Sequence, residues 1–303
     1  MKVMIIGAKG QLGSDIHELL KNTDYNDLGS SFNIVTIDHD TWDIKFSGVA
    51  EAIISKHKPD VVINCAAYHN CNLCEDHPNE AFAVNATALY YLSIACNAYD
   101  AQLIHISTDY VYGIEGTRDT PYTEYDIPGP VQMYGITKLA GENIVRQYCK
   151  RHIILRTSGL YGNKGAATKK YPNFVEMMIT LGKEAIEKDA YLPCTTDQYL
   201  TFTSTKELAR VIHEMITMEF LISVGTFHAT CEGYINRFDF AMEIFKHERM
   251  DVKLTRVTSE YFDSKYEQPK FSVLENYRLK MIGIDMLKWK DALHEYLDNR
   301  AQT

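Results

Sequence analysis

Five short apolar runs in the first 160 residues constrain the fold more than any other feature of this 303-residue sequence. They are residues 2–7, 33–38, 60–65, 102–108 and 152–157. Amphipathic segments that have the pattern of helices lie between them, at 11–22, 47–58, 79–99 and 134–150. Runs this apolar suit strands that are covered on both faces, and strands alternating with helices predict right-handed crossovers. We therefore expect an α/β fold with a doubly wound parallel sheet.

The alternation loosens after residue 160. Further helices are expected at 172–187, 204–219, 237–248 and 288–299, with short strands or loops between them. The sequence has no internal repeat and no flexible linker, so a second lobe would be built from insertions and the C-terminal tail. We expect a main domain from 1–160 plus about 196–230, and a smaller lobe from about 161–195 and 231–303.

Composition excludes several classes of protein. A hydrophobic fraction of 46% with 23% charged residues is typical of a globular protein in water. The longest aliphatic runs are too short for a membrane span or a signal peptide, so we expect no membrane association and a cytoplasmic location. The net charge of -9 argues against nucleic acid as a partner.

The seven cysteines are scattered and are expected to be reduced thiols. Cys71 and Cys74 stand between His69 and His77, which raises the question of a metal site. A closed zinc site usually has four ligands, and no second cysteine pair follows. We favour a polar loop without a metal.

A glycine-rich turn follows the first apolar run, with Gly7, Gly10 and Gly13 in "GAKGQLG". Glycines at this spacing allow a tight turn, a close approach of the backbone to a pyrophosphate and close packing of helix on strand. Asp38 ends the second run, where a carboxylate can bind the ribose diol of a dinucleotide. Residues 1–160 therefore predict a dinucleotide-binding domain of the Rossmann type. Asp38 favours NADH, but His39 and Lys9 leave NADPH open.

Other cofactor contacts are expected from three places. The helix start supplies backbone amides for the phosphates. The segments "DTWDI" and "NCAAY" would lie near the adenine and near the ribose and phosphates, although both could equally be ordinary turns. These expected contacts are Gln11, Leu12, Asp43, Ile44, Ala66, Ala67 and Tyr68.

A tyrosine and a lysine lie one helical turn apart in "MYGITKLAGE". Residues four apart share a face, so Tyr134 and Lys138 can reach one small space. Ser107 and Thr108 end the fourth run, at the carboxyl edge where open α/β sheets bind ligands. We expect Tyr134 to protonate a carbonyl oxygen as hydride reaches its carbon, Thr108 to bind the same oxygen, and Lys138 to hold the ribose. The Lys138 ammonium, together with a nicotinamide cation, would lower the pKa of Tyr134.

The sequence resembles the extended short-chain dehydrogenase/reductases, and within them the sugar-nucleotide reductases that include dTDP-4-dehydrorhamnose reductase. The blocks that carry this resemblance run nearly end to end: "GAKGQLG", "KPDVVINCAAY", "EDHPNEAFAVNATA", "HISTDYVYG", "YGITKLAGE", "ILRTSGLYG", "TTDQ" and "PKFSVLENYRLK". The resemblance implies NAD(P)H-dependent reduction of a nucleotide-linked 4-keto-6-deoxysugar, with a smaller C-terminal substrate-binding lobe. It also implies that Asn85 is a structural and proton-relay partner, with the alternative of an asparagine that binds backbone. Related enzymes are often dimers, so a homodimer is possible.

The residue pair after Thr108 separates reduction from dehydration. Sugar 4,6-dehydratases resemble this chain but carry Asp-Glu there, whereas this sequence has Asp109 and Tyr110. Asp109 is therefore expected to be a hydrogen-bond anchor or helix cap rather than a catalyst. The expected substrate contacts are Ser107, Thr108, Asp109, Tyr110, Gly159, Gln198 and Gln268.

Three departures from the reductase pattern concern the substrate pocket. A tryptophan that lies against the sugar is replaced by Gly159, and a glycine and a proline are replaced by Leu200 and Phe202. Gln268 replaces an arginine, which leaves Lys270 or Lys169 as candidates to bind the diphosphate.

Two alternative functions share this fold. One is a non-catalytic, NADP-binding regulatory subunit, and the other is a sugar-nucleotide epimerase or dehydratase. An intact set of Thr108, Tyr134 and Lys138 argues against the regulatory subunit, which has no need of it.

Overall fold

A six-stranded parallel sheet forms the centre of the protein. The structure is a computed structural model that describes all residues of the chain except 25–30, 117, 163–172, 219–223 and 301–303. The strands lie in the order β10-β5-β4-β3-β1-β2, and every neighbouring pair is parallel. Their bounds are β1 Lys2–Ile6, β2 Asn33–Ile37, β3 Val61–Asn64, β4 Gln102–Thr108, β5 His152–Thr157 and β10 Gly225–His228. The predicted doubly wound α/β sheet is confirmed.

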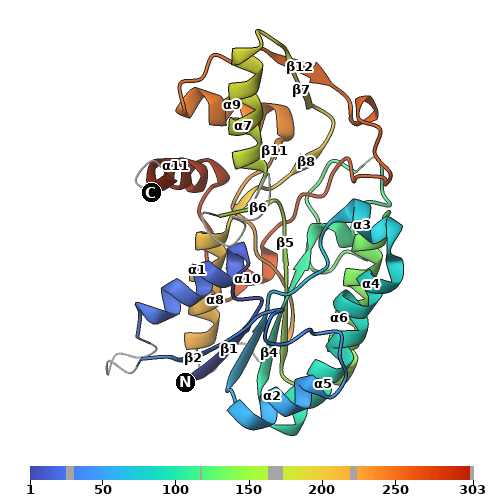
Figure 1. The fold of residues 1–303 in the computed structure, drawn as a ribbon, viewed down its shortest axis with the longest axis vertical. Coiled ribbons are helices and arrows are strands. Elements are labelled where there is room, and N and C mark those ends of the chain that lie inside the picture. The colour runs from blue at the N-terminus through green and yellow to red at the C-terminus, as the bar shows by residue number, and fades with distance from the viewer. Residues whose placement is uncertain (25–30, 117, 163–172, 219–223, 301–303) are drawn as a thin grey trace.

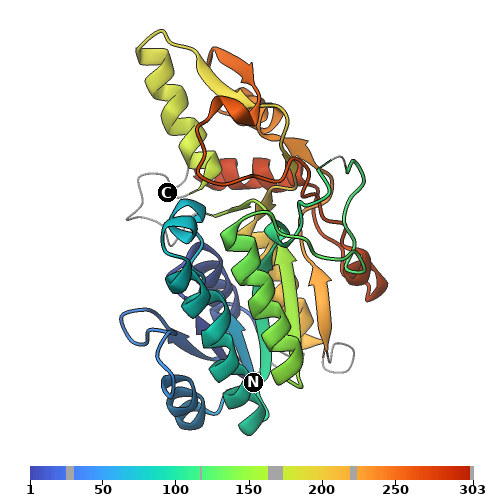
Figure 2. The ribbon, with the colours of Figure 1, turned by 90° about the vertical axis from the view of Figure 1, so that its right-hand side faces the viewer.

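Helices cover both faces of this sheet (Figure 1). On one face lie α1 (Gln11–Lys21) and α8 (Thr205–Thr217), and on the other lie α2 (Val49–His57), α5 (Ala88–Ala98) and α6 (Met133–Tyr148). Figure 2 shows the second layer from the front, with α6 in green and α5 in teal. Side chains alternate along a strand, so Val3 and Ile5 enter one hydrophobic layer while Met4 and Ile6 enter the other. This alternation explains why β1 is apolar from Val3 to Ile6.

A smaller group of elements lies above the sheet in Figure 1. It contains α7 (Phe174–Glu187), α9 (Arg237–His247) and α11 (Trp289–Arg300), which share a separate hydrophobic cluster. Three short strand pairs join them: β7 (Leu192–Thr195) with β12 (Leu254–Val257), β8 (Tyr199–Leu200) with β11 (Ile235–Asn236), and β6 (Leu160–Tyr161) with β9 (Thr203–Ser204). The remaining helix, α10, spans Tyr277–Met281. The domain boundaries at about 160, 196 and 230 stay a prediction.

The segment predicted as one helix over 79–99 is broken into shorter pieces. It consists of α4 (Pro78–Phe82), a π-helical turn (Ala83–Thr87) and α5, and a further short helix, α3 (Cys71–Asp76), precedes it. The favoured interpretation of the Cys71–Cys74 segment as a loop was wrong. The side chain of Asn70 accepts a hydrogen bond from the Leu73 amide and caps α3, while Pro78 begins α4 at a position that needs no amide donor.

The glycine turn between β1 and α1 depends on two residues that tolerate no side chain. Gly7 has φ of 80°, in the left-handed region. A Cβ atom at Gly13 would lie 2.2 Å from the Gly7 carbonyl oxygen, so α1 can approach β1 this closely only with glycine there. Within the described residues, no helix combines the length and apolar character needed to cross a membrane.

We predict that Gly13→Ala lowers the free energy of unfolding by at least about 2 kcal/mol, because α1 must shift away from β1 to relieve the overlap. Urea denaturation measures this change. Gly116→Ala is the control, since a Cβ atom at that exposed turn meets nothing within 4 Å. Equal stability of the two variants would contradict the packing argument.

Candidate active site

A cavity of about 440 Å³ opens at the carboxyl ends of β4 and β5, between the sheet and the smaller group of elements. The glycine turn, the start of α6 and residues of α7 and α9 complete its wall. The predicted site residues that line it are Gly10, Gln11, Leu12, Gly13, Ala67, Ser107, Thr108, Asp109, Tyr110, Tyr134, Lys138 and Gly159. Residues far apart in the sequence therefore meet in one cavity, as expected for a ligand site of an open parallel sheet.

Other predicted cofactor residues lie outside the wall of this cavity. They are Gly7, Asp38, Asp43, Ile44, Ala66 and Tyr68. Asp38 accepts a hydrogen bond from the backbone amide of Lys9 at 2.8 Å and so ties the glycine turn to β2. Asp43 accepts from the Lys45 amide, and Ile44 packs in the hydrophobic layer of α2 and α5. Contacts of these residues with a dinucleotide stay a prediction.

Asn85 is an anchor for the chain after β3. It lies in the π-helical turn, is 1% exposed, and does not line the cavity. Its amide group accepts from the Tyr68 amide at 2.8 Å and donates to the Tyr68 carbonyl and to Thr137 Oγ1, both at 3.0 Å. This arrangement matches the alternative of an asparagine that binds backbone.

Tyr134 stands on the first turn of α6, beside Thr108. Gln132 caps the helix by accepting from the Gly135 amide, and Gly135 leaves room for the Tyr110 carbonyl, which a Cβ atom would approach to 2.0 Å. The ring of Tyr134 is partly buried and meets the ring of Tyr110 edge to face at 6.0 Å. The close approach of α6 to the end of β4 thus brings the phenol to the strand end.

The expected acidification of Tyr134 by Lys138 was wrong for this structure. Burial raises the pKa of the Tyr134 phenol, and a polar interaction with Thr108 only partly opposes it. The Lys138 ammonium is buried and donates instead to the Ile106 carbonyl at 2.7 Å, with His105 Nε2 at 3.1 Å. Burial lowers the pKa of Lys138 to about 8. Tyr134 therefore keeps its proton at neutral pH, which suits a proton donor.

Asp109 is a hydrogen-bond anchor, as expected. Its carboxylate accepts from Ser158 at 2.8 Å, from Ser272 at 2.5 Å and from Thr108 Oγ1 at 3.1 Å. The buried carboxylate thereby joins the ends of β4 and β5 to the C-terminal segment. Burial raises the pKa of Asp109 despite these hydrogen bonds.

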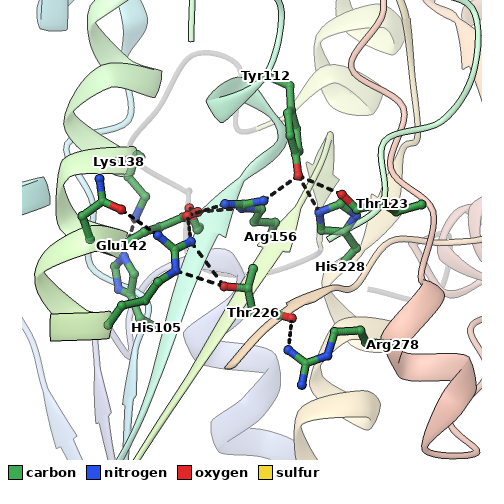
Figure 3. A network of polar contacts seen from close by, with 12 residues as sticks. His105, Tyr112, Thr123, Lys138, Glu142, Arg156, Thr226, His228 and Arg278 are labelled. Carbon is green, nitrogen blue, oxygen red and sulfur yellow. Dashed lines mark hydrogen bonds and ion pairs between the residues drawn. The ribbon is translucent and has the colours of Figure 1, made fainter. Parts of the chain in front are cut away.

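A buried carboxylate, Glu142, connects α6 to both central strands (Figure 3). Arg156 of β5 binds it with Nε and Nη2, at 2.9 and 2.6 Å, and Arg146 adds a hydrogen bond at 2.5 Å. Ser107 of β4 donates to the same carboxylate at 2.6 Å, so its hydroxyl proton points to Glu142. Burial opposes the charge, but Arg156 and Arg146 outweigh burial and hold the pKa of Glu142 below its usual value.

The network continues from Arg156 to the edge strand β10. Arg156 Nη1 donates to the Tyr112 hydroxyl at 2.5 Å, which donates to the Thr123 carbonyl and lies 3.2 Å from His228 Nε2 (Figure 3). Burial and the Arg156 charge lower the pKa of His228 to about 3, so this histidine is neutral. His228 therefore adds no positive charge to the network, and Glu142 balances the charge of Arg156.

Comparisons with known proteins agree with this geometry. The family model described as the RmlD substrate binding domain matches residues 1–302. The chain belongs to this family. The spore coat polysaccharide biosynthesis protein SpsK of Bacillus subtilis is 32% identical over 99% of this chain and 98% of its own.

Two solved structures are close in fold and in sequence. The dTDP-4-dehydrorhamnose reductase of Clostridium acetobutylicum has a TM-score of 0.89 and 38% identity, with both chains fully covered. The Bacillus anthracis dTDP-4-dehydrorhamnose reductase, solved in complex with NADP, has a TM-score of 0.87 and 31% identity, covering 98% of this chain and 99% of that one. The resemblance to extended short-chain dehydrogenase/reductases of this group is confirmed.

Gly159, where the resemblance leads one to expect a tryptophan, lies beside an apolar part of the cavity wall. Gly159 has φ of 56°, and a Cβ atom there would lie 3.1 Å from the ring of Phe202. Phe202, Leu200 and Phe174 all line the cavity, so they supply an apolar wall where the residue at 159 has no side chain. The two departures noted in the sequence, Gly159 and Phe202, are therefore complementary in shape.

Sequence reasoning missed about half of the cavity wall. The missed residues are Cys65, His69, Cys71, Ile106, Thr157, Ser158, Leu160, Phe174, Leu200, Phe202 and Arg237. Leu200 and Phe202 carried a signal, because they replace glycine and proline in the reductase pattern. Arg237 carried none, since it lies outside every block of the resemblance.

The two cysteines of α3 are free thiols whose Sγ atoms lie near backbone carbonyl oxygens. Cys74 Sγ donates to the Tyr68 carbonyl at 3.3 Å, and burial raises the pKa of Cys71 to about 12. In the part of the chain that the structure describes, no three His, Cys, Asp or Glu side chains are grouped to hold a metal ion.

We predict that Arg156→Met lowers the free energy of unfolding by about 3 to 5 kcal/mol, because it leaves the Glu142 carboxylate buried without its main partner. Urea denaturation at pH 7 measures the loss. Arg151→Met is the matched control, since Arg151 and its partner Asp100 are exposed and the variant is expected to unfold almost like the wild type. A loss below about 1 kcal/mol for Arg156→Met would rule out this role.

Proposed function

We propose that this protein is an NAD(P)H-dependent oxidoreductase that reduces a nucleotide-linked 4-keto-6-deoxysugar, as a dTDP-4-dehydrorhamnose reductase does. The observation that carries this proposal is the meeting of Tyr134, Thr108 and the glycine turn in one cavity. The family and the reductase relatives support the same conclusion. A homodimer and a cytoplasmic location stay predictions.

The glycine turn fits the phosphates of a dinucleotide. Gly10 and Gly13 place no side chain on the cavity side, and the first residues of α1 line the cavity, so the positive end of the helix dipole faces it. Lys138 and Asp38 are the residues proposed to hold the two riboses, and NADP in the B. anthracis relative shows which cofactor that protein binds. A reduced nicotinamide in this cavity supplies the hydride for the carbonyl carbon.

The protein's own groups then handle the carbonyl oxygen. Tyr134 gives its phenolic proton to this oxygen as negative charge develops on it. Thr108 donates a second hydrogen bond after its hydroxyl turns from Asp109, the present acceptor at 3.1 Å, toward the substrate. Burial keeps Tyr134 protonated before the reaction, and Lys138, held by the Ile106 carbonyl, has the separate role of holding a ribose.

The neighbouring carboxylate argues against dehydration. A dehydratase needs an acid and a base for loss of water, and the residue after Asp109 is a tyrosine. Asp109 itself is engaged by three hydroxyl groups. Net reduction, in which the cofactor leaves oxidised, therefore fits these residues better than dehydration.

We expect Tyr134→Phe to lower kcat by about 10² or more, because the variant retains the ring but loses the proton donor. Turnover is measured as oxidation of NADPH and NADH with a panel of nucleotide-linked ketosugars, and cofactor affinity is measured separately by titration. Tyr148→Phe is the control, since Tyr148 is an exposed residue at the end of the same helix. Unchanged turnover in Tyr134→Phe would reject the assignment, and tight cofactor binding without any turnover in the wild type would favour a regulatory subunit.

The pH dependence of kcat/KM should show the loss of the proton from Lys138. Its pKa of about 8 means that the ammonium is charged below pH 8 and is lost above it, so kcat/KM should fall on the alkaline side around pH 8. Tyr134 should not contribute in this range, since burial raises its pKa. The residual activity of Tyr134→Phe should therefore keep the same alkaline limb. A flat profile up to pH 9.5 would contradict the role of Lys138.

A further inference from the structure

Arg237 is an arginine at the cavity wall whose charge has no partner among the described residues. It is the first residue of α9, and its guanidinium carbon lies 5.4 Å from the centroid of the Phe174 ring. Its Nε donates to Gln198 Oε1 at 3.0 Å, while no ion pair with a described carboxylate engages it. By contrast, Arg156, Arg210 and Arg300 each pair with one or two glutamates.

Two glutamines that lie outside the cavity wall support this arginine. Gln198 is 4% exposed, and its Nε2 donates to Gln268 Oε1 at 3.0 Å. Gln268 Nε2 lies 3.4 Å from the Tyr266 hydroxyl, and Thr195 Oγ1 donates to Gln198 Oε1 at 3.2 Å. Neither glutamine lines the cavity; Gln198 contacts Arg237 directly, and Gln268 acts only through Gln198. These hydrogen bonds fix Nε, and no acceptor among the described residues engages the two terminal nitrogens of the guanidinium.

Arg237 lies where it could bind an anionic part of a substrate whose reacting carbonyl is near Tyr134. Burial raises the pKa of Tyr110, and Arg237 is the largest influence that opposes this rise, so the guanidinium lies near the ring that contacts Tyr134. The fork of N–H donors on a guanidinium suits phosphate oxygens. In a nucleotide-linked sugar, the diphosphate is joined directly to the sugar that is reduced, so its negative charge enters the cavity with the sugar.

The other cationic residues that could bind the diphosphate are less suitable. Lys138 lines the cavity but donates to the Ile106 carbonyl. Lys270 is exposed, does not line the cavity, and lies 4.0 Å from Glu260. Lys169 lies outside the described residues.

We propose that Arg237, oriented by Gln198 and Gln268, binds the diphosphate of the nucleotide-sugar substrate. The proposal rests on the proposed function and assigns the role of the arginine that Gln268 replaces to a residue of another helix. Gln198 and Gln268 are then positioning residues, which act through Arg237.

Binding of thymidine diphosphate and thymidine monophosphate to the full chain tests this site without requiring turnover. Titration calorimetry should show that Arg237→Gln weakens thymidine diphosphate by about 10- to 100-fold, the range for losing a charged hydrogen bond, and weakens the monophosphate much less. Arg237→Lys, which keeps the charge but loses the fork, should lie between the wild type and Arg237→Gln. Lys270→Gln is the matched control and should bind both nucleotides like the wild type.

A second variant separates the role of Arg237 from damage to the fold. Gln198→Glu keeps the size of the side chain and places a carboxylate 3 Å from the guanidinium, where it should compete with the diphosphate and weaken it in the same selective way. In both variants NADPH affinity should stay unchanged. In turnover assays, KM for the nucleotide sugar should rise more than kcat falls.

Three results would overturn the proposal: unchanged thymidine diphosphate affinity in Arg237→Gln, an equal loss for both nucleotides, or a loss of NADPH affinity instead. The failure of the proposed function looks different. A wild-type protein that binds thymidine diphosphate through Arg237 but reduces no nucleotide-linked ketosugar would support the site and refute the reductase activity.

Discussion

The buried ion pair between Glu142 and Arg156 is the constraint on which the arrangement of the site depends. Glu142 is fully buried and Arg156 is 2% exposed, so their charges must remain together. Since Glu142 lies on α6 two turns after Tyr134 and also accepts from Ser107 of β4, the pair locks this helix against β4 and β5. The geometry between the phenol and the strand end follows from this lock, because Tyr134 and Thr108 come from the elements that the pair joins.

Burial gives the ionisable groups of this region different protonation states. Lys138 is held by a backbone carbonyl and is easily deprotonated, whereas Tyr134 is hard to deprotonate. Asp109 is kept by three hydroxyl groups as a structural anchor. A tyrosine that retains its proton suits reduction, in which the protein must give one proton to an oxygen. The side of the cavity formed by α7 and α9 is built differently, with apolar residues beside Arg237, which forms no ion pair with the described carboxylates.

Much of the main sheet could be predicted from the sequence. Each apolar run became a strand within a residue or two, because most of these strands are buried on both faces and are therefore apolar along most of their length. The glycine turn was predictable because local geometry requires glycine at both positions. Gly7 has a left-handed φ, and Gly13 lies in close contact with the backbone of the turn. Helix α3 was missed, although Asn70 carries a cap signal, because the polar sequence of Cys71–Asp76 is typical of a loop.

By itself, the sequence determined the fold, the glycine turn and the pairing of Tyr134 with Lys138 on one helix face, since these depend on neighbours along the chain. The tertiary structure alone decided that the Lys138 ammonium donates to the Ile106 carbonyl and that Phe202 fills the space beside Gly159. It also decided that Arg237 lies at the cavity wall, where Gln198 binds it and Gln268 binds Gln198. Those outcomes join residues that lie 30 to 70 positions apart, and a pKa or a pocket wall is set by what surrounds a group in space.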